Sequence, residues 1–164
     1  MSRLLKTSIG KPEKWLIEAA ATIALDFSEL THETTNDFVI HTIKQHGNIE
    51  NEKSRGQLPV TIKDIEQIPE IVKNPDCAII GIKKYREILN AYLKRNTDCS
   101  IIYIEEILNG KKNKTLRSKT LYIKIGRVSN KNFIKIISNN ANTDLSNSKM
   151  VVGAGGNPGG EALK

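Results

Sequence analysis

The segment IIYIEEILNGKKNKTLRSKTLYIKIG, residues 101–126, carries the pattern that decides the fold. Residues 101–108 form a mostly apolar run, and over residues 120–126 apolar side chains alternate with polar or small ones. The first pattern is typical of a buried strand, and the second of a strand with one buried and one polar face. The segment therefore predicts two strands on either side of a basic stretch.

The chain before this segment begins with helical patterns. Apolar residues at helical spacing predict helices over residues 11–28 and 38–46. Residues 34–37 supply caps for the second helix, and Gly47 ends it. Residues 48–58 are polar and lack periodicity, so we expect a loop there.

The pattern changes to strands in the middle of the chain. Thr61 and Asp64 have the spacing of a capping box and predict a further helix, which Pro69 ends or restarts. The spacing over residues 85–94 fits a helix as well as a strand. With this ambiguity left open, three more strand candidates are residues 77–82, 88–94 and 133–137.

The 164 residues are the length of one ordinary domain, and helices followed by strands predict an α+β domain with an antiparallel sheet. We expect this domain to span residues 1–137, and the Asn-, Ser- and Gly-rich residues 138–164 to form a flexible tail. No run is apolar enough for a membrane helix or a secretory signal. Cys77 and Cys99 are expected to be buried thiols of a protein that works in a reducing compartment.

Positive charge is concentrated in the last third of the chain. Residues 1–109 have 14 Lys and Arg against 16 Asp and Glu, whereas residues 110–164 have 11 against 2. This density of one sign is typical of proteins that bind a phosphate-rich partner, and a solvated lysine-rich face is the alternative. The candidate phosphate-binding cations are Lys111, Lys112, Lys114, Arg117, Lys119 and Lys124.

The three histidines are His32, His41 and His46. On an ideal helix, His41 and His46 point about 140° apart, so they share a site only if the helix frays at Gly47. Histidine is the side chain most often used to move a proton on and off a ribose hydroxyl. A helix C-cap and a half-buried polar residue are the alternative roles.

Two further groups of side chains suit phosphate binding. Arg55 can bind a phosphate with two parallel hydrogen bonds, and Gln57 follows it in the segment ENEKSRGQ, which is otherwise an ordinary charged surface loop. Thr120, Tyr122 and Lys124 share one strand face, although such alternation is also ordinary strand composition. No nucleotide-binding loop, nucleophile elbow or metal-binding carboxylate cluster is found in the sequence, so we expect any catalysis to be acid–base chemistry without metal or cofactor.

Three stretches in this order, residues 23–47, 50–76 and 101–126, resemble the phage-associated branch of the barnase–EndoU–colicin–RelE (BECR) nucleases. The pieces that carry the resemblance are a helix ending in His-Gly, RGQLPVT, the pattern DIxxIPEIVxNPD, and a strand, basic segment and Thr-x-Tyr ending. The resemblance implies N-terminal helices packed on a twisted antiparallel β-sheet, a metal-independent ribonuclease site on the sheet, and frequent action as a toxin. Residues 83–100 depart from the glycine-containing hairpin of the relatives.

By position, the resemblance assigns the site to His41 and His46 of the helix motif, Arg55 and Gln57 of the loop motif, and Thr120 and Tyr122 of the strand motif. We therefore predict an endoribonuclease that cleaves RNA by transesterification. His46, or His41 as second choice, takes the proton of the 2′-hydroxyl. Arg55 or a lysine such as Lys112 or Lys119 stabilises the phosphate.

The expected partners are RNA, with tRNA among the candidates, and an acidic immunity or antitoxin protein. The expected site of action is the bacterial cytoplasm, reached directly or after delivery by a phage or secretion system. Two other functions stay open: a nucleic-acid-binding module without catalysis, and a phage accessory or structural protein that docks through its basic surface.

Overall fold

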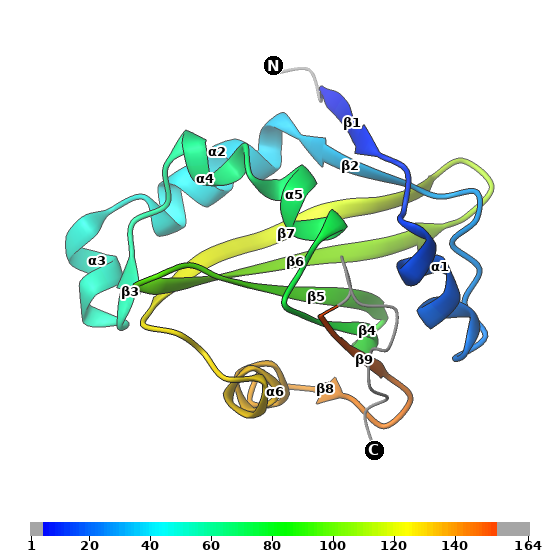
Figure 1. Cartoon of the computed structure of the whole chain (residues 1–164). Coiled ribbons are helices and arrows are strands. Elements are labelled where there is room, and N and C mark those ends of the chain that lie inside the picture. The colour runs from blue at the N-terminus through cyan, green and yellow to red at the C-terminus, as the bar shows by residue number, and fades with distance from the viewer. Residues whose placement is uncertain (1–4, 154–164) are drawn as a thin grey trace.

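The computed structural model describes residues 5–153 (Figure 1). In chain order the elements are β1 (Lys6–Gly10), α1 (Lys14–Ala21), β2 (Thr31–Thr35), α2 (Asn36–His46), α3 (Ile49–Ser54), β3 (Gln57–Leu58), α4 (Ile62–Ile65), α5 (Ile68–Lys73), β4 (Cys77–Lys84), β5 (Glu87–Arg95), β6 (Cys99–Asn109), β7 (Lys114–Ile125), α6 (Asn130–Ser138), β8 (Thr143–Asp144) and β9 (Lys149–Val152).

The strands form one open, twisted sheet in the order β1-β2-β7-β6-β5-β4-β8, with β3 also paired to β7 and β9 to β4. The predicted α+β class with helices on a largely antiparallel sheet is confirmed. One pair departs from it: β2 runs parallel to β7. A parallel neighbour needs a crossover connection, which here includes the whole meander from β4 to β6.

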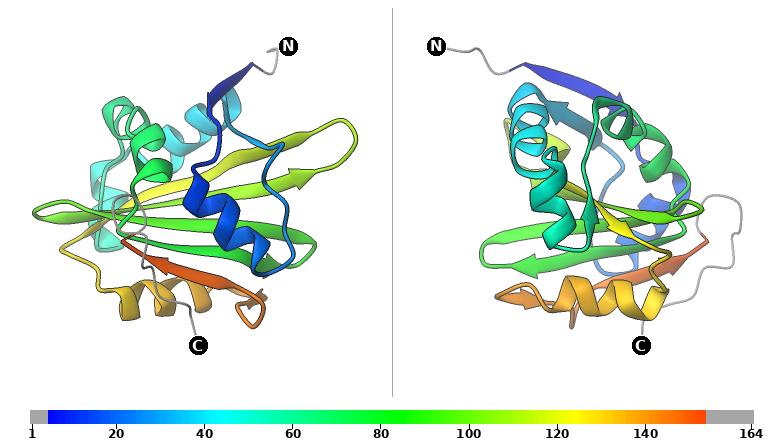
Figure 2. Two further views of the ribbon diagram at one scale, coloured as in Figure 1. Left: turned by 45° about the vertical axis from the view of Figure 1, so that its right-hand side comes forward. Right: turned by 90° about the vertical axis from the view of Figure 1, so that its left-hand side faces the viewer.

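Both faces of the sheet are covered, and each has its own core (Figure 2). On one face Leu16 of α1 and Ile71 of α5 pack with Tyr92 and Tyr103 of the central strands. On the other, Phe133 of α6 packs with strand residues such as Leu93 and Ile102. Burial on both faces explains why β5 gave an ambiguous pattern: nearly every residue in its middle is apolar or buried, so alternation is lost.

The predicted starts of two helices are confirmed where a side chain caps the helix by bonding to nearby backbone. The Thr35 hydroxyl accepts a hydrogen bond from the Phe38 amide at 3.1 Å and caps α2, which Gly47 ends as predicted. Asp64 accepts from the Thr61 amide at 2.8 Å, which confirms the capping box at α4. The first predicted helix is shorter than expected, because α1 ends at Ala21.

Predictions for three segments are wrong: the strand at residues 133–137, the loop at residues 48–58 and the start of the tail at residue 138. Residues 133–137 belong to helix α6, because Phe133 and Ile137 are four residues apart and lie on one buried helix face. The predicted loop 48–58 contains α3 and β3.

The tail predicted to begin at residue 138 instead contributes β8 and β9. Met150 and Val151 of β9 are buried, and β9 pairs with β4 along an edge of the sheet. An edge strand is stabilised by such a cover, which a polar composition does not reveal. The part of the expected tail after residue 153 lies outside the described residues.

The two cysteines differ from each other. Cys77 is buried as predicted, and burial raises the pKa of its thiol to about 12. Cys99, at the start of β6, is only partly buried. Both thiols are free.

A fully buried carboxylate connects three strands in the core. One Glu105 oxygen lies 2.8 Å from Nδ1 of His32 on β2. The other accepts hydrogen bonds from the Asn90 amide at 3.0 Å and from the Tyr92 hydroxyl, both on β5. Because a buried polar group without partners is costly, these contacts fix β2 to the central meander.

We expect Glu105→Ala to lower the free energy of unfolding by about 3 to 5 kcal/mol, because the buried partners of the carboxylate lose their acceptor. Urea unfolding followed by circular dichroism measures this. Glu106→Ala is the control, since that side chain is partly exposed and its loss costs about 1 kcal/mol or less. Equal losses for the two variants would contradict the assigned role of Glu105.

Candidate active site

The site depends on how helix α2 crosses the edge of β7. Strand β2 pairs with β7 as far as Arg117, and β3 pairs with it at Ile123 and Lys124. Ile123 lies six residues after Arg117 along the strand, which is about 20 Å. The eleven residues of α2 span about 16 Å, and with Thr34 and Thr35 they bridge this gap. The C-terminal end of α2 therefore arrives where β3 joins the sheet.

Two backbone contacts hold that end in place. The Val60 amide donates to the His46 carbonyl at 2.6 Å, just after β3 has paired with β7. Gly47 donates its own amide to Ile43 at 2.9 Å, and a Cβ at this position would lie 2.3 Å from the same carbonyl oxygen. The close turn after His46 thus requires glycine.

The His46 ring lies between an acid and an aromatic ring. Its Nδ1 is 3.2 Å from Oε2 of Glu52, whose side chain is fully buried. Its plane stacks on Tyr122 with ring centroids 6.0 Å apart and an angle of 29°. The other Glu52 oxygen accepts from the guanidinium of Arg55 at 3.1 Å. Glu52 therefore holds both the imidazole and the guanidinium.

These contacts leave the His46 imidazole, the Arg55 guanidinium and the Tyr122 phenol able to act on a ligand. An Nδ1 proton donated to Glu52 would leave Nε2 of His46 as a free base. The Arg55 side chain is about half exposed, with 52% of its surface accessible, so it can still reach an anion. The Tyr122 phenol is protonated at neutral pH and can donate a hydrogen bond, and burial raises its pKa further, to about 12.

Strand pairing brings further predicted residues to the same end of β7. Gln57 stands opposite Lys124 in the β3–β7 register, and Thr120 shares the β7 face of Tyr122. The Gln57 side-chain oxygen is buried, with no hydrogen-bond partner among the described residues. His46, Arg55, Gln57, Tyr122 and Lys124 thus gather at one end of β7.

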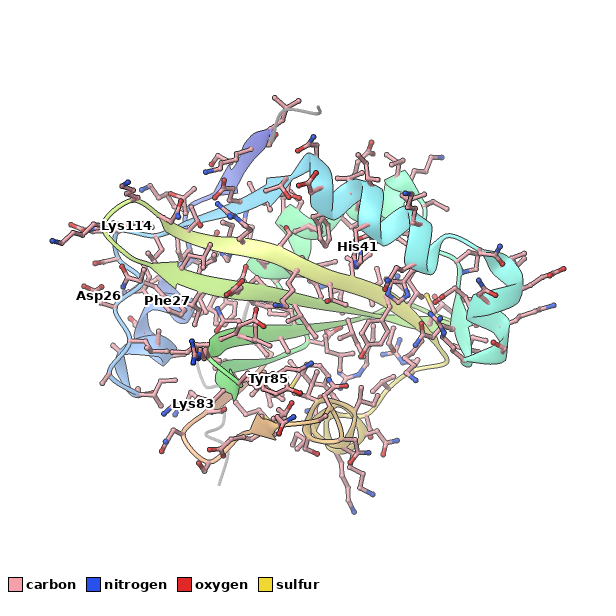
Figure 3. All side chains as sticks on the ribbon, turned by 180° about the vertical axis from the view of Figure 1, so that it is seen from behind. Asp26, Phe27, His41, Lys83, Tyr85 and Lys114 are labelled. Atoms are coloured by element: carbon pink, nitrogen blue, oxygen red, sulfur yellow. The ribbon has the colours of Figure 1, made fainter. Side chains whose placement is uncertain are left out.

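The remaining histidines lie elsewhere. His41 is exposed on α2 beside β7, about one turn before His46 (Figure 3). His32 is buried in the core against Glu105 and has no access to the site.

The predicted cations do not form one patch. Lys114, at the opposite end of β7 from Tyr122, forms an ion pair with Glu29 at 2.8 Å (Figure 3). Arg117 lies 3.6 Å from Glu33, and Lys119 forms a close ion pair with Glu87. Acids from the first two thirds of the chain therefore neutralise the middle of the basic segment. Lys111 and Lys112 lie in the β6–β7 turn, far from His46 along the strand.

Glu52 is the side chain of this site to which the sequence analysis assigned no role. The signal for it was present at Asn48, whose side chain accepts from the Glu50 and Asn51 amides and caps α3. An Asn cap predicts a helix that follows it, and a helix turns Glu52 inward. Because residues 48–58 were predicted to form a loop, the inward orientation of Glu52 was not predicted.

Within residues 5–153, no three His, Cys, Asp or Glu side chains are grouped so that they could hold a metal ion. Among the helices in the same part of the chain, none is long and apolar enough to cross a bilayer.

The fold and the site together define a nuclease-like α+β domain, in which an imidazole and cationic side chains meet on a twisted sheet. The family model described as phage-Barnase-EndoU-ColicinE5/D-RelE like nuclease3 matches residues 10–131, which are 122 of the 164 residues, and the chain belongs to this family. The resemblance inferred from the sequence is thereby confirmed. No curated protein and no solved structure matches the chain.

Burial of Tyr122 predicts a loss of stability at high pH. The folded phenol keeps its proton up to a pKa of about 12, whereas the unfolded chain loses it near pH 10. The unfolded state is thus favoured as the pH rises above 10, by about 1 kcal/mol at pH 11. Urea unfolding at pH 9 and pH 11 measures the change.

We expect Tyr122→Phe to lose less stability than the wild type between these two pH values. Tyr92 and Tyr103, whose pKa values burial also raises, are present in both proteins and cancel in the comparison. Identical losses would show that the Tyr122 phenol is not protected from ionisation.

Proposed function

We propose that the protein is a metal-independent endoribonuclease that cleaves RNA by transesterification. The observation that carries the proposal is the His46 ring, bound through Nδ1 to the buried Glu52 and stacked on Tyr122 beside the basic strand. Membership of a nuclease family supports nucleic acid as the substrate.

In the proposed reaction, Nε2 of His46 takes the proton of a ribose 2′-hydroxyl. The 2′-oxygen attacks the adjacent phosphorus and forms a 2′,3′-cyclic phosphate. The bond from phosphorus to the 5′-oxygen breaks, that oxygen takes a proton from water, and the hydroxide left behind takes the proton of the His46 imidazolium, which restores the base. Glu52 stabilises the imidazolium and fixes its orientation.

Charge gathers on the phosphoryl oxygens as the bond forms. Arg55 and Lys124 are the cations at this end of β7, and both suit stabilisation of that charge. The Tyr122 and Thr120 hydroxyls and the Gln57 side chain orient the phosphate by hydrogen bonds. His41 is the second candidate base, on the same helix but exposed.

The proposal extends to the setting of the reaction. RNA is the substrate, with tRNA among the candidates, and the reaction takes place in the cytoplasm. An acidic immunity or antitoxin protein covers the site in cells that make the enzyme, because the cations at this end of β7, Arg55 and Lys124, favour an acidic partner. Toxicity on expression is the corresponding biological effect.

We expect His46→Ala to slow RNA cleavage by roughly 10²- to 10⁴-fold, because the general base is lost. Purified protein is incubated with total RNA in EDTA, and products are followed by gel electrophoresis. His41→Ala, on the exposed side of the same helix, tests the second candidate base and should retain most of the activity. DNA should stay intact, because it lacks the 2′-hydroxyl.

Intact RNA with the wild type would overturn the enzymatic proposal in favour of a binding module. Equal cleavage by wild type and His46→Ala would overturn only the assignment of the base, and loss of activity in His41→Ala alone would transfer that role to His41.

Glu52→Gln tests the positioning of the imidazole. The amide keeps the size of the side chain but removes the charge, so we expect kcat to fall at least about tenfold while KM changes little. ¹⁵N NMR of the His46 ring reports which nitrogen carries the proton, and the variant should lose the Nδ1–H form. Unchanged tautomer and kcat would limit Glu52 to a structural role.

A further inference from the structure

A cavity lies at the opposite end of the sheet from His46. It has a volume of about 600 Å³ and is lined by the β4–β5 turn and the β6–β7 turn, including Arg86, Leu108, Lys111 and Lys112. The amide of Gly110 donates to the Asn113 carbonyl at 2.8 Å, which closes the turn that presents the two lysines. The cavity is therefore framed by two hairpin turns on neighbouring strands.

The cations of this cavity are available to a ligand. Arg86, Lys111 and Lys112 are exposed, and none of them forms an ion pair with another described residue. The cavity also contains two acids, Glu87 and Glu106.

Both acids have cationic neighbours outside the cavity lining. Glu87 is paired with Lys119. Arg117, which stands opposite Glu106 in the β6–β7 register, has Glu33 as its ion-pair partner, so three cations of the cavity face one remaining acid. The free charge of the cavity is therefore positive, which suits an anion.

The pairing of three β7 cations with acids divides the basic surface into two parts. Lys114, Arg117 and Lys119 each have an acid partner, so cations without one lie at the two ends, at the turn and at Lys124. The nine residues from Lys114 to Tyr122 span about 26 Å of strand. At about 3.4 Å per stacked nucleotide, this is roughly eight nucleotides.

We propose that the cavity between the β4–β5 and β6–β7 turns is a second phosphate-binding subsite, and that the substrate is an RNA long enough to occupy it and the His46 site together. The inference rests on the proposed function for the His46 site and narrows its substrate class to oligomeric or folded RNA. Backbone phosphates bind at Arg86, Lys111 and Lys112, and the scissile phosphate lies at the other end of β7.

The test uses the charge reversal Lys111→Glu/Lys112→Glu, with Lys11→Glu/Lys63→Glu as the matched control. The control changes the same charge at exposed lysines outside the cavity. Binding is measured by fluorescence anisotropy with two labelled RNAs of 4 and 16 nucleotides, fully 2′-methoxylated so that they cannot be cleaved. Kd is measured over a range of salt concentrations, and KM and kcat are measured with the matching cleavable RNAs.

We expect Lys111→Glu/Lys112→Glu, the turn variant, to bind the 16-mer more weakly than the wild type does. The slope of its log Kd against log salt should be smaller by about 1.4, which is about 0.7 for each lost phosphate contact. KM for the 16-mer should rise with kcat unchanged, while the 4-mer is unaffected. The control variant should match the wild type with both RNAs.

Equal Kd and equal salt slope for wild type and turn variant with the 16-mer would overturn the subsite, and would leave the turn as a surface for a protein partner. Because the methoxylated RNAs test binding without cleavage, this result is independent of catalysis. Failure of the wild type to cleave either cleavable RNA would instead overturn the proposed ribonuclease.

Discussion

Strand β7 is the element on which the rest of the structure depends, because two different strands share one of its edges. β2 pairs with its first part in parallel, and β3 pairs with its end in the opposite direction. The direction of the chain must therefore reverse over a gap of about 20 Å, and α2 is of the right length to cover most of it. The position of His46 against Tyr122 follows from this constraint.

The interior on either side of this edge relies on buried carboxylates. Glu105 connects β2 to the meander through His32, Asn90 and Tyr92, and Glu52 connects α2 and α3 through His46 and Arg55. A buried carboxylate is favourable only when its oxygens are bonded, so each one fixes the relative position of its partners. The cluster around Glu105 lies in the core, whereas the cluster around Glu52 includes the half-exposed Arg55 and so reaches the surface.

The surface charge also depends on the fold. Along the chain the basic residues follow one another without an acid, but in space three of them meet Glu29, Glu33 and Glu87. What is left are two separate groups of cations at the two ends of β7. Electrostatic attraction for a long polyanion is thereby distributed over the sheet rather than concentrated at the site.

The sequence by itself determined the features that depend on neighbouring residues: the cap at Thr35, the end of α2 at Gly47, the capping box at Asp64, and the strands with apolar runs. It also offered His46, Arg55 and Tyr122 as candidates, and the fold brings them to one end of β7. Tertiary structure alone decided that β9 joins the sheet and that three cations of the basic segment are paired with acids. Each of these depends on contacts between residues distant in the chain, and such contacts leave no periodic pattern in the sequence.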